Sequence, residues 1–120
     1  MKLSGSMLTS GDVIQLDLGL PEGREAGFRH PAVVVTAQRI LNAQPNVIQV
    51  VPLTSTVRGF AAEVTIEPDS MNGLQNQSAA QCQHIRAVST KRADEVIGNV
   101  GAAAVSQIRD TIGLILDIPR

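Results

Sequence analysis

One nine-residue segment in the middle of the chain constrains the fold more than any other. Residues 46–54 carry an almost continuous apolar pattern, which predicts a strand buried on both faces. Its aliphatic side chains are Val47, Ile48, Val50, Val51 and Leu53. Because Pro52 has no N–H to donate, we expect the hydrogen-bond ladder to be interrupted or to end near it.

Shorter segments with β-type patterns flank this strand. Alternation around Ile14, Leu16 and Leu18 predicts a strand over residues 12–18, and a β-branched run opened by proline predicts another over 31–36. A short helical turn is expected over 38–43. Further strands are predicted over 61–67, 78–88 and 95–100.

The last element has a different period. Apolar residues spaced by three and four predict an amphipathic helix over 102–117, with Arg109 and Asp110 facing solvent. Its stripe consists of Val105, Ile108, Ile112, Ile115 and Leu116. Gly113 within the helix suggests a point of close packing. Since an apolar stripe needs a partner layer, we predict a mainly β fold with α, a small curled antiparallel sheet or barrel closed by a C-terminal helix.

The size and composition fit one domain. The chain has 120 residues, of which 43% are hydrophobic and 18% charged, enough for a true core. We assign residues 9–120 to that domain and 1–8 to a flexible leader, with Met7 as a natural start. Only 2% of residues are aromatic, so the core is aliphatic and an RNA platform built on ring stacking is excluded.

The net charge and the cysteine content limit the possible classes of protein further. The formal net charge of -1 excludes a uniformly basic protein, although a polyanion can still bind a local patch. The single cysteine, Cys82, cannot form an internal disulfide and is predicted to be a small core residue. No signal peptide or bilayer-spanning run is evident, so a cytoplasmic location is expected.

Two segments are candidates for a binding function. Residues 19–30 combine four turn residues with charged side chains, a composition typical of a long functional loop. Residues 84–92 hold Arg86, Lys91 and Arg92 and no acid, which suits a surface that follows phosphates. The two histidines, His30 and His84, have no metal-ligand spacing, and we expect no metal or other cofactor.

Five pieces of the chain, taken in order, resemble the MazF/PemK toxins of bacterial toxin–antitoxin systems, and the resemblance covers residues 9–118. They are Gly11-Asp12-Val13 through Asp17-Leu18-Gly19, Gly23-x-Glu25, Pro31 to Val35, Val51-Pro52-Leu53-Thr54-Ser55, and Gln83 to Val88 with Lys91-Arg92. The resemblance implies an SH3-like (CcdB/PemK-type) barrel that forms a homodimer. It also implies metal-independent cleavage of single-stranded RNA at short sequences. A cognate MazE-like antitoxin would cover the RNA groove with its disordered tail, and DNA binding by the toxin alone is not expected.

The resemblance also points to site residues. The family usually has arginine directly before the proline, whereas this chain reads Arg29-His30-Pro31, so either residue can fill the arginine position. In RNA cleavage, an arginine can stabilise the negative charge of the phosphorane. His30 or Glu25 can transfer the proton of the ribose 2′-OH. Thr54 offers a hydroxyl to a phosphate oxygen. Candidate RNA-binding residues are Arg24, Phe28, Ser55, Thr56, Arg58 and Arg86.

Two other functions stay open at this point. CcdB toxins, which poison DNA gyrase, share this barrel, and their activity would depend on the C-terminal helix rather than on Arg29, His30 or Thr54. A barrel that only binds a partner chain is the third possibility.

Overall fold

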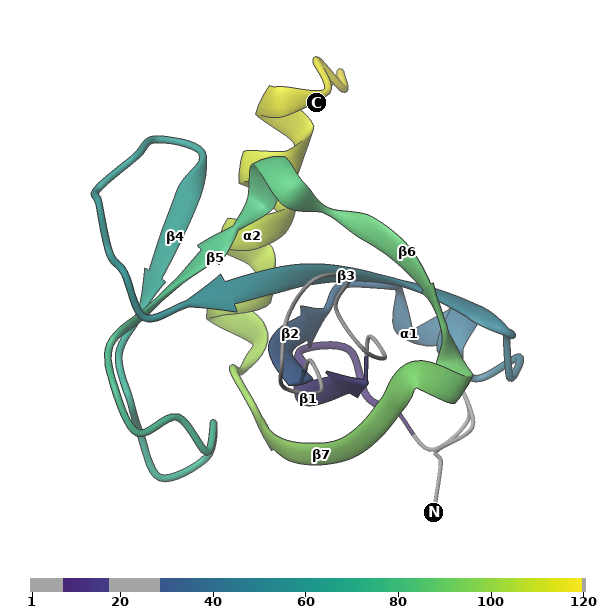
Figure 1. The fold of residues 1–120 in the computed structure, drawn as a ribbon. Coiled ribbons are helices and arrows are strands. Elements are labelled where there is room, and N and C mark those ends of the chain that lie inside the picture. Colours follow the sequence, from purple (N-terminus) through teal and green to yellow (C-terminus); the bar gives the residue numbers. More distant parts are fainter. Residues whose placement is uncertain (1–7, 18–28, 120) are drawn as a thin grey trace, which may run out of the picture.

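The computed structural model describes residues 8–17 and 29–119, which form seven antiparallel strands and a C-terminal helix (Figure 1). The strands are β1 (Asp12–Asp17), β2 (Arg29–Val34), β3 (Val47–Thr54), β4 (Glu63–Ile66), β5 (Ser78–Gln81), β6 (Arg86–Ser89) and β7 (Ala93–Asn99). The helices are α1 (Gln38–Leu41), the 3-10 turns η2 (Cys82–His84) and η3 (Thr90–Arg92), and α2 (Ala102–Ile115). No helix in this part of the chain is long and apolar enough to cross a membrane.

Strand β3 organises the sheet. The strand order is β4-β5-β3-β2-β1-β7, and β6 also pairs with β3. The first half of β3, Val47 to Val50, pairs with β6, whereas Leu53 and Thr54 pair with β5. Pro52 lies between these two ladders, as its missing N–H predicts. Strands β6 and β7 curl around β1 and β2 (Figure 1), which confirms the predicted small barrel with a C-terminal helix.

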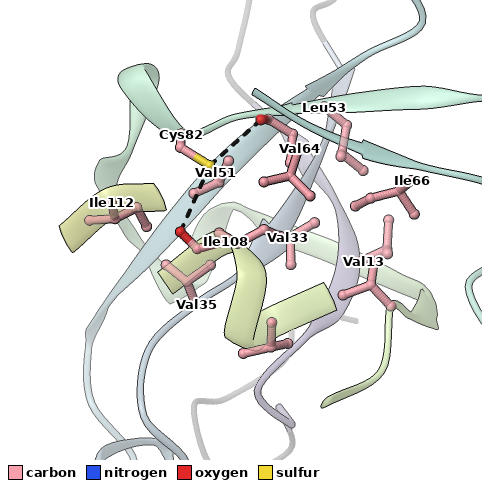
Figure 2. Packing of buried hydrophobic residues seen from close by; sticks show 13 residues of the cluster. Val13, Val33, Val35, Val51, Leu53, Val64, Ile66, Cys82, Ile108 and Ile112 are labelled. Atoms are coloured by element: carbon pink, nitrogen blue, oxygen red, sulfur yellow. Dashed lines mark hydrogen bonds between the residues drawn. The ribbon is translucent and has the colours of Figure 1, made fainter. Parts of the chain in front are cut away.

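The central strand is largely buried on both faces in its second half, as predicted, but in its first half Val47 and Gln49 are exposed, so the prediction fails there. Successive residues of a strand point to opposite sides, so Val50 and Val51 enter different apolar clusters, and neither is exposed to solvent. One cluster fills the barrel with Ile14, Leu16, Ile48 and Leu41. The other lies between the sheet and α2, where Ile108 and Ile112 pack against Val35 and Val51 (Figure 2).

Two predicted elements need correction. The single strand over 78–88 is wrong, because the 3-10 turn η2 divides it into β5 and β6, which pair with different halves of β3. Leu8, predicted as part of a flexible leader over 1–8, is buried in the barrel cluster, and its carbonyl accepts a hydrogen bond from Gln38 Nε2 at 3.3 Å. The rest of the predicted leader lies outside the described residues.

The helix also differs in two details. Arg109 is not simply a solvent-facing residue, because its guanidinium donates to Ser10 Oγ at 2.6 Å and to the Val35 carbonyl at 3.2 Å. These bonds hold α2 to the sheet. Gly113 does not mark a close contact, since nothing lies within 4 Å of the position that a Cβ would occupy.

Candidate active site

The start of β2 and the end of β3 lie side by side and form one wall of a cavity of about 560 Å³. Antiparallel pairing sets Ala32 opposite Pro52, so His30 at the start of β2 comes close to Thr54 at the end of β3. His30, Thr54 and Ser55 all line the cavity. The structure therefore brings together three of the predicted site residues.

His30 is partly buried in this wall. Burial lowers the pKa of its imidazole below the ordinary value of 6.5, and a hydrogen bond with the backbone of Leu53 opposes that shift only in part. The neutral ring therefore predominates at pH 7. A neutral imidazole at the edge of a cavity is suited to accepting a proton from a bound hydroxyl.

Thr54 begins a short hydroxyl-rich turn. Its Oγ1 accepts a hydrogen bond from the N–H of Thr56 at 3.1 Å, which fixes the side-chain orientation and leaves the hydroxyl hydrogen to donate. Ser55 and Thr56 are exposed. Arg58, farther along the same segment, lies with its guanidinium 5.6 Å from the centre of the Phe60 ring, a cation–π contact outside the cavity wall.

Arg29 points elsewhere. It is not among the described residues that line the cavity, and its Nη2 forms an ion pair with Asp94 Oδ2 on β7. Its side chain is 56% exposed and that of Asp94 is 29% exposed. Of the adjacent pair Arg29-His30, His30 is therefore the residue that faces Thr54.

The remaining predicted residues lie apart from the cavity or cannot be placed. Arg86 is exposed on β6 opposite Val50, four residues and about 13 Å along β3 from Thr54. Arg24, Glu25 and Phe28 lie outside the described residues.

The rest of the cavity lining contains residues that were not predicted. Gly73, Leu74, Gln75 and Asn76 come from the loop before β5, and Gln15 and Ile97 come from β1 and β7. The Asn72-Gly73 pair signals a turn in the sequence, but nothing local indicates that this turn reaches the end of β3.

Cys82 is a core residue, as predicted. It is fully buried, and burial raises the pKa of its thiol to about 11, so it is unreactive as a nucleophile. Its Sγ lies 3.9 Å from the carbonyl oxygen of Ile108 in α2 (Figure 2). Within residues 8–17 and 29–119, no group of three His, Cys, Asp or Glu side chains is arranged to hold a metal ion.

Comparison with known proteins places this chain in a family. Residues 9–116 match the model of the PemK-like, MazF-like toxin of type II toxin–antitoxin systems. Endoribonuclease MazF9 of Mycobacterium tuberculosis is 35% identical over 117 residues, covering 93% of this chain and 98% of the relative. Endoribonuclease MazF3 from the same species is 27% identical over 86 residues, covering 72% of this chain and 82% of the relative.

Solved structures show the same fold. The MazE–MazF complex of Deinococcus radiodurans matches with a TM-score of 0.75 at 25% identity, covering 93% of this chain and 97% of that chain. A mycobacterial endoribonuclease in complex with its cognate antitoxin matches with a TM-score of 0.74 at 19% identity, covering 94% and 98%. These relatives give no support to the gyrase-poison alternative. The chain belongs to the PemK/MazF family of type II toxin–antitoxin toxins.

Proposed function

We propose that this protein is a metal-independent endoribonuclease toxin that cleaves single-stranded RNA at short specific sequences. The observation that carries the proposal is the cavity shared by His30, Thr54 and Ser55, in a family whose relative MazF9 is named an endoribonuclease. The three side chains supply a proton acceptor and two hydroxyl groups at adjoining strand ends.

The proposed reaction uses the substrate's own nucleophile. Neutral His30 removes the proton from the ribose 2′-OH, and the 2′-oxygen attacks the adjacent phosphorus while the bond to the 5′-oxygen breaks. The products are a 2′,3′-cyclic phosphate and a 5′-hydroxyl end, whose proton comes from solvent or from a protonated site group. The Thr54 hydroxyl, held by its bond from Thr56, donates to a non-bridging oxygen as charge develops.

Arg29 has a separate role in this proposal. Its guanidinium can form two hydrogen bonds with a phosphate, but in the free protein Asp94 holds it. We propose that Arg29 binds RNA phosphate after exchanging this carboxylate for the substrate. Glu25 is the alternative proton carrier if His30 proves dispensable.

The test compares the two histidines. His30→Ala should reduce the cleavage rate of a single-stranded RNA by about 10²–10⁴-fold, measured with EDTA present, which should leave the wild-type rate unchanged. His84→Ala is the matched control, because His84 is exposed on η2 and does not line the cavity. If His30→Ala cleaves at the wild-type rate, His30 is only a strand-entry residue.

The pH dependence separates His30 from Arg29. As a base, His30 acts in its neutral form, so the rate should rise with pH through its pKa and level off above it. Because burial lowers that pKa, the rising part of the pH–rate profile should lie below pH 6.5. It should persist in Arg29→Ala and vanish in His30→Ala. If the cleavage rate of His30→Ala still rises with pH in this way, the proton transfer would be assigned to Glu25.

We also propose two protein partners. The structural relatives include MazF with MazE and an endoribonuclease with its cognate antitoxin. By analogy, a MazE-like antitoxin should bind this chain and compete with RNA for one groove, formed by a homodimer. Simultaneous binding of an antitoxin peptide and an uncleavable RNA, with no mutual weakening, would contradict this. The chain alone, with its net charge of -1, is expected not to bind operator DNA.

A further inference from the structure

The loop between β4 and β5 contains Asn72-Gly73, the only place in the chain where glycine follows asparagine. This dipeptide has a reaction of its own. The backbone nitrogen of the glycine attacks the side-chain carbonyl carbon (Cγ) of the asparagine, and no side chain on the glycine hinders the approach. The N–Cγ bond forms, the Cγ–Nδ2 bond breaks, and ammonia leaves with the proton of the glycine N–H. Water then opens the cyclic imide to aspartate or isoaspartate.

The folded protein holds the reacting carboxamide in place. Asn72 is almost completely buried, and its Oδ1 accepts hydrogen bonds from the N–H groups of Asp69 and Leu74. Its Nδ2 donates to the carbonyl of Glu67. Attack requires the carboxamide to turn toward the nitrogen of Gly73 and to release ammonia, which breaks these bonds. The fold therefore opposes the reaction at this position.

The same loop packs backbone to backbone against β7. A Cβ on Gly73 would lie 2.1 Å from the carbonyl oxygen of Ile97, and a Cβ on Gly98 would lie 2.3 Å from the carbonyl carbon of Asn72. Isoaspartate adds a methylene group to the main chain, and this contact has no room for it. Aspartate replaces the Nδ2 donor by a second acceptor facing the carbonyl of Glu67. Neither product fits the docked loop.

We propose that Asn72-Gly73 is a site of spontaneous deamidation that the fold keeps silent and that reacts when the loop leaves β7. The rate in the native protein is then the rate in the open chain multiplied by the fraction of molecules that are open. Because the ammonia is lost, each event is irreversible. Chains that open are therefore withdrawn from the folded population, with no need for RNA or a protein partner.

The first test places a second glycine after an asparagine in the same loop. Asn76 is exposed, and its side chain makes no hydrogen bond to any residue that the structure describes, so Gln77→Gly creates an unshielded counterpart. Mass-spectrometric peptide mapping in mildly alkaline buffer follows both positions in one molecule. In the folded variant, Asn76 should deamidate about tenfold or more faster than Asn72, and in guanidinium chloride the two rates should agree within about twofold.

A second test loosens the loop. Gly98→Ala adds a Cβ at the contact with Asn72 and should raise the native deamidation rate of Asn72 by about fivefold or more. Gly113→Ala is the matched control, because nothing lies within 4 Å of its Cβ position, and it should not raise that rate. Wild type aged in guanidinium chloride is then refolded and passed over a size-exclusion column. The refolded fraction should retain Asn72 unmodified, and the remaining fraction should contain the deamidated chains.

Three results would overturn the proposal. One is equal deamidation of Asn72 and Asn76 in the folded Gln77→Gly variant. Another is an Asn72 that stays unmodified in guanidinium chloride while Asn76 reacts. The third is deamidated chains that refold as completely as unmodified ones.

Discussion

Asn72 is expected to be the most sensitive polar residue of the turn that leads into the cavity lining at Gly73. Only 1% of it is exposed, and its Oδ1 accepts from the N–H groups of Asp69 and Leu74 at 3.2 and 3.0 Å. Its Nδ2 donates to the Glu67 carbonyl at 2.8 Å. Asn72→Ala removes three hydrogen bonds, each with a net value of about 0.5–1.5 kcal/mol. We therefore expect the free energy of unfolding to fall by about 3 kcal/mol.

Urea denaturation followed by circular dichroism measures this loss directly. Asn76→Ala is the control, because its exposed side chain makes no hydrogen bond within the described residues, and it should change stability by about 0.5 kcal/mol or less. A loss below about 1 kcal/mol for Asn72→Ala would refute the reasoning. It would mean that water replaces the amide and that the wall does not depend on this side chain.

Gly98→Ala should destabilise the protein by about 1–3 kcal/mol, because its Cβ would lie 2.3 Å from the backbone of Asn72, whereas Gly113→Ala should stabilise α2 by about 1 kcal/mol. Thermal melts that show the same sign for both would contradict the packing described. Asp94→Asn should change stability by less than about 1 kcal/mol and tighten RNA binding, because Arg29 then has no carboxylate to leave. Arg29→Ala should remove one phosphate contact and make the slope of log K against log salt less negative by about 0.7. An unchanged slope would show that Arg29 does not bind phosphate. Ile118, 53% exposed beside an apolar cavity of about 310 Å³ between α1 and the end of α2, is proposed to lie at the homodimer contact. Ile118→Glu should give monomers by light scattering, and a wild-type monomer at micromolar concentration would refute the dimer.

The fold was largely predictable because its elements carry strong local patterns. The apolar run of β3, the alternating apolar residues of β1 and the three-and-four spacing of α2 each predicted the element that forms there, although β1 is covered on both sides rather than on one. The division of residues 78–88 was not predictable. It depends on β5 and β6 meeting different halves of β3, which is a long-range pairing without a local pattern.

The site was predictable in part for a similar reason. Thr54 and Ser55 follow a clear strand, so their position at its end could be inferred. The choice between Arg29 and His30 could not, because adjacent strand residues point to opposite faces and a shift of one residue exchanges them. The wall with Gln75 and Asn76 depends on the close approach of Gly73 to Ile97, far away in the sequence.

The alternating side chains of β3 have a consequence for how the molecule comes apart. Val50 and Val51 are successive residues of one backbone, yet each anchors a different apolar cluster. Loosening either cluster frees the strand that aligns the other, so neither can melt alone. Unfolding should therefore be one cooperative step, with the amide protons of β3 exchanging only when the whole domain opens.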